Sequence, residues 1–82
     1  MSSAAKRVAE MRANPNGDWR IAVLEAVANA LDIKIRKSGR RHMGFSHSGV
    51  PTRMTVPARR PIKPIYIRRF IEFIDEIGSQ RT

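Results

Sequence analysis

Residues 33–56 read IKIRKSGRRHMGFSHSGVPTRMTV, three short runs in which apolar side chains alternate with polar or charged ones. A period of two is typical of a strand with one buried face and one exposed face. Ser38-Gly39 and Ser48-Gly49 lie between the runs and have the composition of turns. The segment therefore predicts three antiparallel strands, at residues 33–36, 41–46 and 52–56. The side chains expected to face the core are Ile33, Ile35, Met43, Phe45, Met54 and Val56.

Helical patterns lie on both sides of these strands. Before them, apolar side chains recur every four residues, as in an amphipathic helix, and Asp18 is placed to cap its start. These side chains are Trp19, Val23, Val27 and Leu31. After the strands, a proline-rich segment leads to Pro64, which suits the first position of a helix, and Gly78 is expected to end that helix. Its apolar side comprises Ile67, Phe70, Ile71, Ile74 and Ile77.

The length of 82 residues predicts one small domain. Residues 1–17 are expected to form a leading helix and a turn, residues 18–78 an α-β-β-β-α core, and residues 79–82 a tail. This order predicts an α+β fold of two layers, with both core helices on one face of a three-stranded antiparallel sheet. The opposite face of the sheet is then open.

The charges are unevenly distributed along the chain. Sixteen Lys and Arg against seven Asp and Glu give a net charge of +9, and no acidic residue occurs between Ile33 and Ile71. Eleven cations lie in that window, which favours a surface for a polyanion over an ordinary solvated surface of mixed charge. Alternation along the strands places Lys34, Arg36 and His42 on the open face, together with Arg53.

Several classes of function are disfavoured by composition. The chain has no cysteine, so disulfides, thiolate-bound metals and cysteine nucleophiles are excluded, and no His or carboxylate cluster has the spacing of metal ligands. The apolar stretch 21–31 is interrupted by Glu25 and is shorter than the ~20 residues of a membrane span. The start of the chain lacks the apolar region of a secretory signal. We therefore expect a cytoplasmic protein with no membrane contact, no metal and no small-molecule cofactor.

Two motifs resemble the HicA toxin family. They are His42-Met43-Gly44-Phe45-Ser46-His47, and the segment 55–64, TVPARRPIKP, which leads into the helical 66–70, YIRRF. The resemblance covers residues 19–75. It implies a double-stranded-RNA-binding-like fold and a small ribonuclease that cleaves mRNA without the ribosome and is neutralised by a HicB-type antitoxin. It also implies that His42 is the catalytic histidine. The chain departs from the usual Gly-Ser-His of the family, because Gly39 is followed by Arg40 and Arg41 before His42.

The candidate site follows from these residues. Histidine is the side chain whose ordinary pKa lies nearest neutrality, so it suits general acid–base cleavage of RNA without a metal. His47 is not expected to share the phosphate, because a separation of five residues places it ~16 Å along the strand and on the other face. The acid is left open between Lys63, Tyr66 and water. The residues expected to bind RNA phosphates are Lys34, Arg36, Arg40, Arg41, Arg53 and Lys63.

Two other interpretations compete with the ribonuclease. Charge and fold alone are equally typical of a nucleic-acid-binding module without catalysis, whereas a surface for acidic protein or lipid is the weakest alternative. Arg59 and Arg60 lie in the proline-rich loop and are expected to contact either RNA backbone or an acidic antitoxin. Trp19, Phe45 and Phe70 match buried positions, so they are expected to pack in the core.

Overall fold

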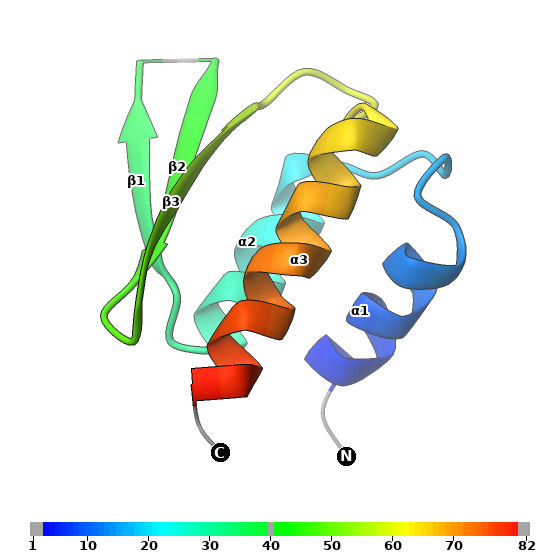
Figure 1. Cartoon of the computed structure of the whole chain (residues 1–82). Coiled ribbons are helices and arrows are strands. Elements are labelled where there is room, and N and C mark those ends of the chain that lie inside the picture. Colours follow the sequence, from blue (N-terminus) through cyan, green and yellow to red (C-terminus); the bar gives the residue numbers. More distant parts are fainter. Residues whose placement is uncertain (1–2, 40, 81–82) are drawn as a thin grey trace.

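The computed structural model describes residues 3–39 and 41–80 of the chain. These residues contain a three-stranded sheet and three helices. Figure 1 shows the sheet, then α2 and α3 against one of its faces, then α1 on the far side of those two helices. The elements are α1 (Ser3–Ala13), α2 (Ile21–Ala30), β1 (Lys34–Ser38), β2 (His42–His47), β3 (Val50–Pro57) and α3 (Pro64–Gln80). The α+β class and the three antiparallel strands are confirmed.

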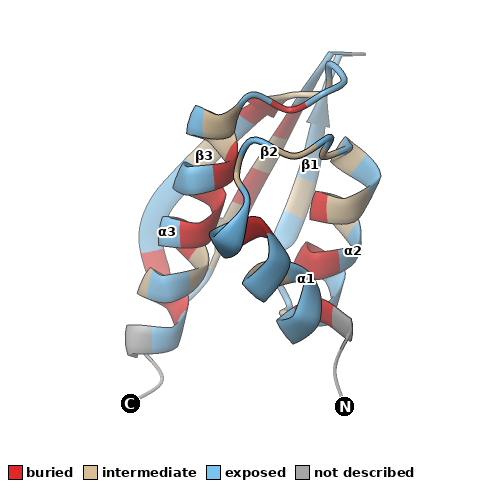
Figure 2. Cartoon of the chain, turned by 90° about the vertical axis from the view of Figure 1, so that its right-hand side faces the viewer, coloured by how far each residue is buried: buried red, intermediate tan, exposed pale blue. Residues whose placement is uncertain are grey.

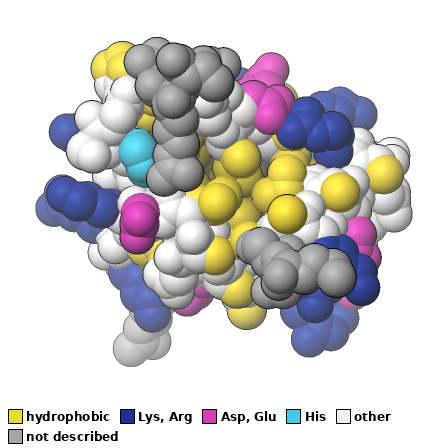
Figure 3. Space-filling model, turned by 90° about the horizontal axis from the view of Figure 1, so that it is seen from below, with side chains coloured by type: hydrophobic (Ala, Val, Ile, Leu, Met, Phe, Trp, Pro, Cys, Tyr) yellow, Lys and Arg dark blue, Asp and Glu magenta, His cyan; other side chains and the backbone are white. Residues whose placement is uncertain are grey.

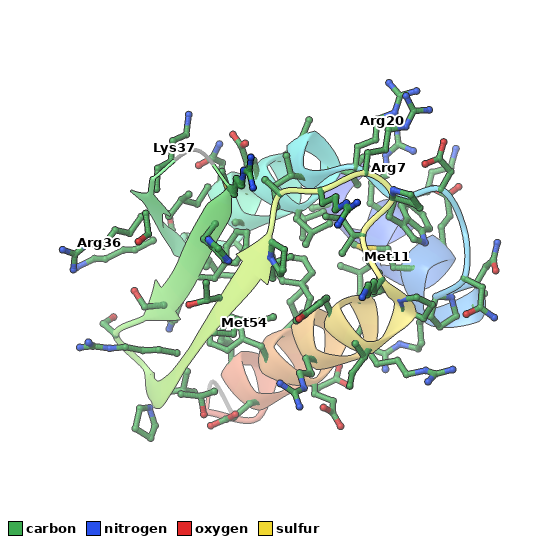
Figure 4. The ribbon with its side chains drawn as sticks, turned by 90° about the horizontal axis from the view of Figure 1, so that it is seen from above. Arg7, Met11, Arg20, Arg36, Lys37 and Met54 are labelled. Atoms are coloured by element: carbon green, nitrogen blue, oxygen red, sulfur yellow. The ribbon has the colours of Figure 1, made fainter. Side chains whose placement is uncertain are left out.

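The leading helix adds a layer that the sequence did not predict. Helix α1 packs on α2 and α3 and not on the sheet, so the molecule has a sheet layer and two helical layers. Met11 of α1 is fully buried between these helices (Figure 4). Arg12 and Asp75 join α1 to α3 through hydrogen bonds of 3.0 and 2.6 Å, and this contact lowers the pKa of the Asp75 carboxyl. Neither helical layer reaches the open face of the sheet.

The sheet has the order β1-β2-β3, and its register fixes which side chains share a face. Ile35 pairs with Phe45 and Phe45 with Met54, while Met43 pairs with Val56. These residues point toward α2 and α3, and Figure 2 shows the buried positions on the facing sides of helices and strands. The Phe45 and Phe70 rings lie 5.2 Å apart at 58° and join the sheet to α3. Such tilted ring pairs add ~0.5–1.5 kcal/mol to the stabilisation from burial.

The connection between α2 and β1 sets the phase of the first strand. Asp32 takes a left-handed conformation with φ 58°, and the Ile33 N–H donates to the Ala28 carbonyl at 2.9 Å. This is the arrangement of a Schellman motif, which satisfies a free carbonyl at the end of a helix. Ile33 is buried, so the next residue, Lys34, points away from the helices.

Some expected boundaries were wrong. Helix α2 begins at Ile21 with Arg20 at the N-cap position, so Asp18 lies too early in the chain to cap it and forms an ion pair with Arg60 instead. Helix α3 continues through Gly78 to Gln80, since Gly78 does not take the positive φ that ends many helices. Strand β3 begins at Val50 and includes Pro51, which an edge strand tolerates. Strand β1 covers Lys34–Ser38 and not residues 33–36, and strand β2 covers His42–His47 and not residues 41–46.

Among the described residues, every helix is too short or too polar to cross a lipid bilayer.

Candidate functional site

The open face of the sheet carries three rows of paired residues. Lys34 pairs with Ser46 and Ser46 with Arg53; Arg36 pairs with Gly44 and Gly44 with Thr55; Ser38 pairs with His42 and His42 with Pro57. Each row alternates with a row that faces the helices, so the prediction that Lys34, Arg36, His42 and Arg53 share one face is confirmed. All four are exposed, and Figure 4 shows Arg36 pointing away from the helices.

The three strands contain no Asp or Glu, so no strand residue brings negative charge to the open face. At the β3 edge, Glu72 and Glu76 of α3 line a hollow together with Arg53. The carboxylate of Glu76, on α3, accepts hydrogen bonds from the Thr52 hydroxyl at 2.8 and 2.9 Å. Thr52 precedes Arg53 and therefore points to the helix side of the sheet. A different surface is seen at the end where both chain termini lie: apolar side chains gather at its centre, and charged side chains of both signs lie around its rim (Figure 3).

His42 begins β2 at one end of the open face and lines a hollow. The hollow has a volume of about 530 Å³ and is lined by Arg41, His42, Pro57, Ala58 and Arg59. The Ala58 N–H donates to the Arg41 carbonyl at 2.7 Å, which holds the chain after β3 beside the start of β2. Two arginines therefore lie at the same hollow as the imidazole. Such an arrangement suits a phosphate, since guanidinium groups bind its oxygens through two parallel hydrogen bonds.

The loop that carries Arg59 is held at its far end by two contacts with the connection between α1 and α2. The Ile62 N–H donates to the Trp19 carbonyl at 2.8 Å, and Ile62 is buried. The Arg60 guanidinium binds the Asp18 carboxylate at 2.7 and 3.3 Å. The hydrogen bond lowers the pKa of Asp18 and raises the pKa of Arg60. Arg60 is thus occupied by an acid of its own chain, while the neighbouring Arg59 lines the hollow.

A second hollow adjoins the first. It is lined by Pro57, Arg59, Pro61, Lys63 and Tyr66, and its volume is about 150 Å³. Pro57 and Arg59 line both hollows and form the wall between them. Tyr66 lies in the first turn of α3, where its N–H donates to the Lys63 carbonyl at 2.9 Å. The structure therefore places both predicted acids, Lys63 and Tyr66, at the second hollow and not at the hollow of His42.

His47 lies at the other end of β2 and is used locally. Its Nδ1 accepts a hydrogen bond from the Gly49 N–H at 2.9 Å, within the turn between β2 and β3. The pairing of His47 with Val50 is also shifted relative to the regular register. His42 and His47 are the first and last residues of the strand, so they do not share one phosphate.

The remaining predicted residues lie at different distances from His42. Lys34 and Arg53 occupy the row farthest from it, four residues along each strand and therefore ~13 Å away. They extend the basic surface and do not line the hollow. Arg40 lies outside the described residues. Sequence reasoning did not place Arg59 at the His42 site. The signal was present, because an antiparallel third strand that reaches Pro57 brings residues 58 and 59 beside Arg41.

Within residues 3–39 and 41–80, no three His, Asp or Glu side chains come together as a metal-binding group. Comparisons with protein-family models, with curated proteins and with solved structures each return no match for this chain. The open face and the two hollows are therefore interpreted from their own geometry and chemistry.

Proposed function

We propose that this protein is an endoribonuclease of the HicA toxin type, which cleaves mRNA with His42 and is neutralised by a HicB-type antitoxin. One observation carries the proposal: an exposed histidine lines a hollow together with two arginines, at the end of a sheet whose three strands contain no acidic residue. The order α2-β1-β2-β3-α3, with both helices on one sheet face, supports the double-stranded-RNA-binding-like fold that the resemblance implies.

The open face binds the RNA backbone through its cations. Phosphate contacts supply sequence-independent affinity, and the sheet offers Lys34, Arg36 and Arg53 over the two rows beyond His42. The scissile phosphate lies in the hollow of His42, where Arg41 and Arg59 stabilise the negative charge that increases in the transition state. Arg59 is the added member of this site relative to the residues expected from the sequence.

The His42 imidazole removes the proton of the ribose 2′-hydroxyl. The 2′-oxygen then attacks phosphorus, the bond from phosphorus to the 5′-oxygen breaks, and a 2′,3′-cyclic phosphate forms. The leaving 5′-oxygen takes its proton from water, because Lys63 and Tyr66 line the adjoining hollow and not this one. The products are a 5′-hydroxyl and a cyclic phosphate, and the base is a side chain, so the proposed reaction needs no metal.

Cleavage of RNA in EDTA tests the proposal. Replacement of a general base costs ~10²–10⁴-fold in rate, so His42→Ala is expected to lose cleavage by that factor while it still binds RNA. His47→Asn is the matched control, because it removes the other histidine of the same strand and keeps a side-chain acceptor for the Gly49 N–H. Equal loss in the two variants, or full cleavage by His42→Ala, would contradict the role of His42.

A binding module without catalysis is the second candidate, because the rows of Lys34, Arg36 and Arg53 lie away from the imidazole and need no chemistry to hold RNA. A wild-type protein that binds RNA and never cleaves it would establish that function in place of the nuclease.

A further inference from the structure

The second hollow has a lining that differs from that of the first. Pro57, Pro61 and Tyr66 contribute apolar rings to its lining, and Arg59 and Lys63 contribute two cations. The hollow of His42 instead combines the imidazole with Arg41 and Arg59. The lining of the His42 hollow suits a phosphate, whereas the lining of the second hollow suits a planar ring that is attached to a phosphate.

The size of the second hollow is that of a single ring. Its volume is about 150 Å³, and an apolar cavity of ~150 Å³ in another protein holds one benzene molecule. A stretch of polymer does not fit, whereas one nucleobase can enter while its sugar and phosphate stay at the wall. Because Pro57 and Arg59 border both hollows, that wall is shared with the phosphate site.

Tyr66 is held in place by the fold. It lies in the first turn of α3, its backbone N–H is bonded to the Lys63 carbonyl, and it packs partly against the hydrophobic core. The other lining residues belong to the segment between β3 and α3, which Ile62 and Arg60 tie to the α1–α2 connection. The segments that line the hollow are therefore held by contacts within the protein, so little ordering is needed when a base stacks on the ring.

We propose that the hollow lined by Pro57, Arg59, Pro61, Lys63 and Tyr66 is a nucleobase subsite, in which one base of the RNA stacks on Tyr66 beside the phosphate held at His42. This inference rests on the proposed RNA substrate and adds how the chain recognises it. Stacking tolerates any base, so the subsite selects single-stranded RNA, whose bases are free to leave the helix, over paired RNA.

Binding of a short single-stranded 2′-fluoro RNA tests the subsite without cleavage, because this probe lacks the attacking hydroxyl. Loss of one base–aromatic stack costs ~1–3 kcal/mol, so Tyr66→Ala is expected to weaken binding by roughly 5- to 150-fold. Tyr66→Phe keeps the ring and is expected to bind like the wild type. Ile65→Ala is the matched control, since it removes an exposed apolar side chain from the same turn of α3.

An abasic position moved step by step along the same probe identifies the base. At one position, removing the base is expected to weaken binding to the wild type by the same factor as the Tyr66→Ala substitution weakens binding of the intact probe. For Tyr66→Ala, removing the base at that position is expected to cause no further loss of affinity. If every abasic probe weakens the wild type and Tyr66→Ala equally, Tyr66 does not stack on a base and the inference is wrong.

A second measurement uses the wild type alone, in case Tyr66→Ala does not fold. Cytidine monophosphate is expected to bind roughly 5- to 150-fold more tightly than ribose 5-phosphate. It is also expected to shift the amide resonances of Arg59, Lys63 and Tyr66 in the NMR spectrum. Equal affinities would overturn the subsite. The nuclease proposal fails separately: a wild type that shows these binding differences but does not cleave ordinary RNA would contradict the nuclease and leave the subsite intact.

Discussion

The salt dependence of RNA binding gives the sharpest test of the open face. The structure places five described cations on that face or at the hollow of His42, which are Lys34, Arg36, Arg41, Arg53 and Arg59. If each neutralises one phosphate of single-stranded RNA, the logarithm of the affinity falls with the logarithm of the salt concentration at a slope of about −3.5. The non-cleavable 2′-fluoro RNA is the probe, and fluorescence anisotropy between low and physiological salt is the assay.

Neutralising three of these cations changes the slope by a defined amount. The triple variant Lys34→Ala, Arg36→Ala and Arg53→Ala leaves two of the five cations, so the slope is expected to become shallower, about −1.4. The hollow of His42 is untouched in this variant. Cleavage measured at saturating RNA is therefore expected to keep its maximal rate, while the RNA concentration needed for half of that rate rises.

A matched control separates the open face from net charge. The triple variant Lys6→Ala, Arg7→Ala and Arg68→Ala removes the same number of Lys and Arg from α1 and α3. Arg7 pairs with Glu10 at 3.7 Å on the exposed surface, so its loss costs little stability. The control is expected to keep the slope of about −3.5, with a small uniform loss of affinity. Equal slopes for the two triple variants would refute a binding surface on the sheet and leave only a diffuse attraction.

Three further predictions concern stability. Phe45→Ala removes the fully buried ring that contacts Phe70, so it is expected to lower the free energy of unfolding by ~3–5 kcal/mol, measured by urea denaturation. Gly78→Ala is expected to raise that free energy by ~0.5–1 kcal/mol, because Gly78 lies in α3 with a helical backbone and open space around it; a lower value would contradict this assignment. The pKa of Asp18 is lower in the folded protein, so the stabilisation by its pair with Arg60 is present above the unfolded pKa and disappears as pH falls through the folded one. Thermal unfolding of Asp18→Asn is therefore expected to vary less with pH below ~4 than that of the wild type, and identical acid profiles would contradict the ion pair.

Much of the candidate face was predictable because a strand repeats every two residues. The alternation in residues 33–56 was enough to put Lys34, Arg36, His42 and Arg53 on one side, and the absence of acids in that window was visible directly. The helix boundaries were less predictable. Asp18 has the residue type of a helix cap, but α2 begins three residues later with Arg20 as its N-cap, and Asp18 instead pairs with Arg60, 42 residues further along the chain. A local pattern contains no information about such a partner.

The sequence by itself determined the class of fold, the open basic face and the position of His42 on it, since these follow from periodicities and charges within short segments. Only the tertiary structure decided what surrounds that histidine. Arg59 reaches the hollow, and Tyr66 reaches its neighbour, because the loop from Pro57 to Lys63 is tied at one end to Arg41 and at the other to Trp19 and Asp18. The path of a loop depends on contacts between residues far apart in the chain, and those contacts form only when the layers pack together.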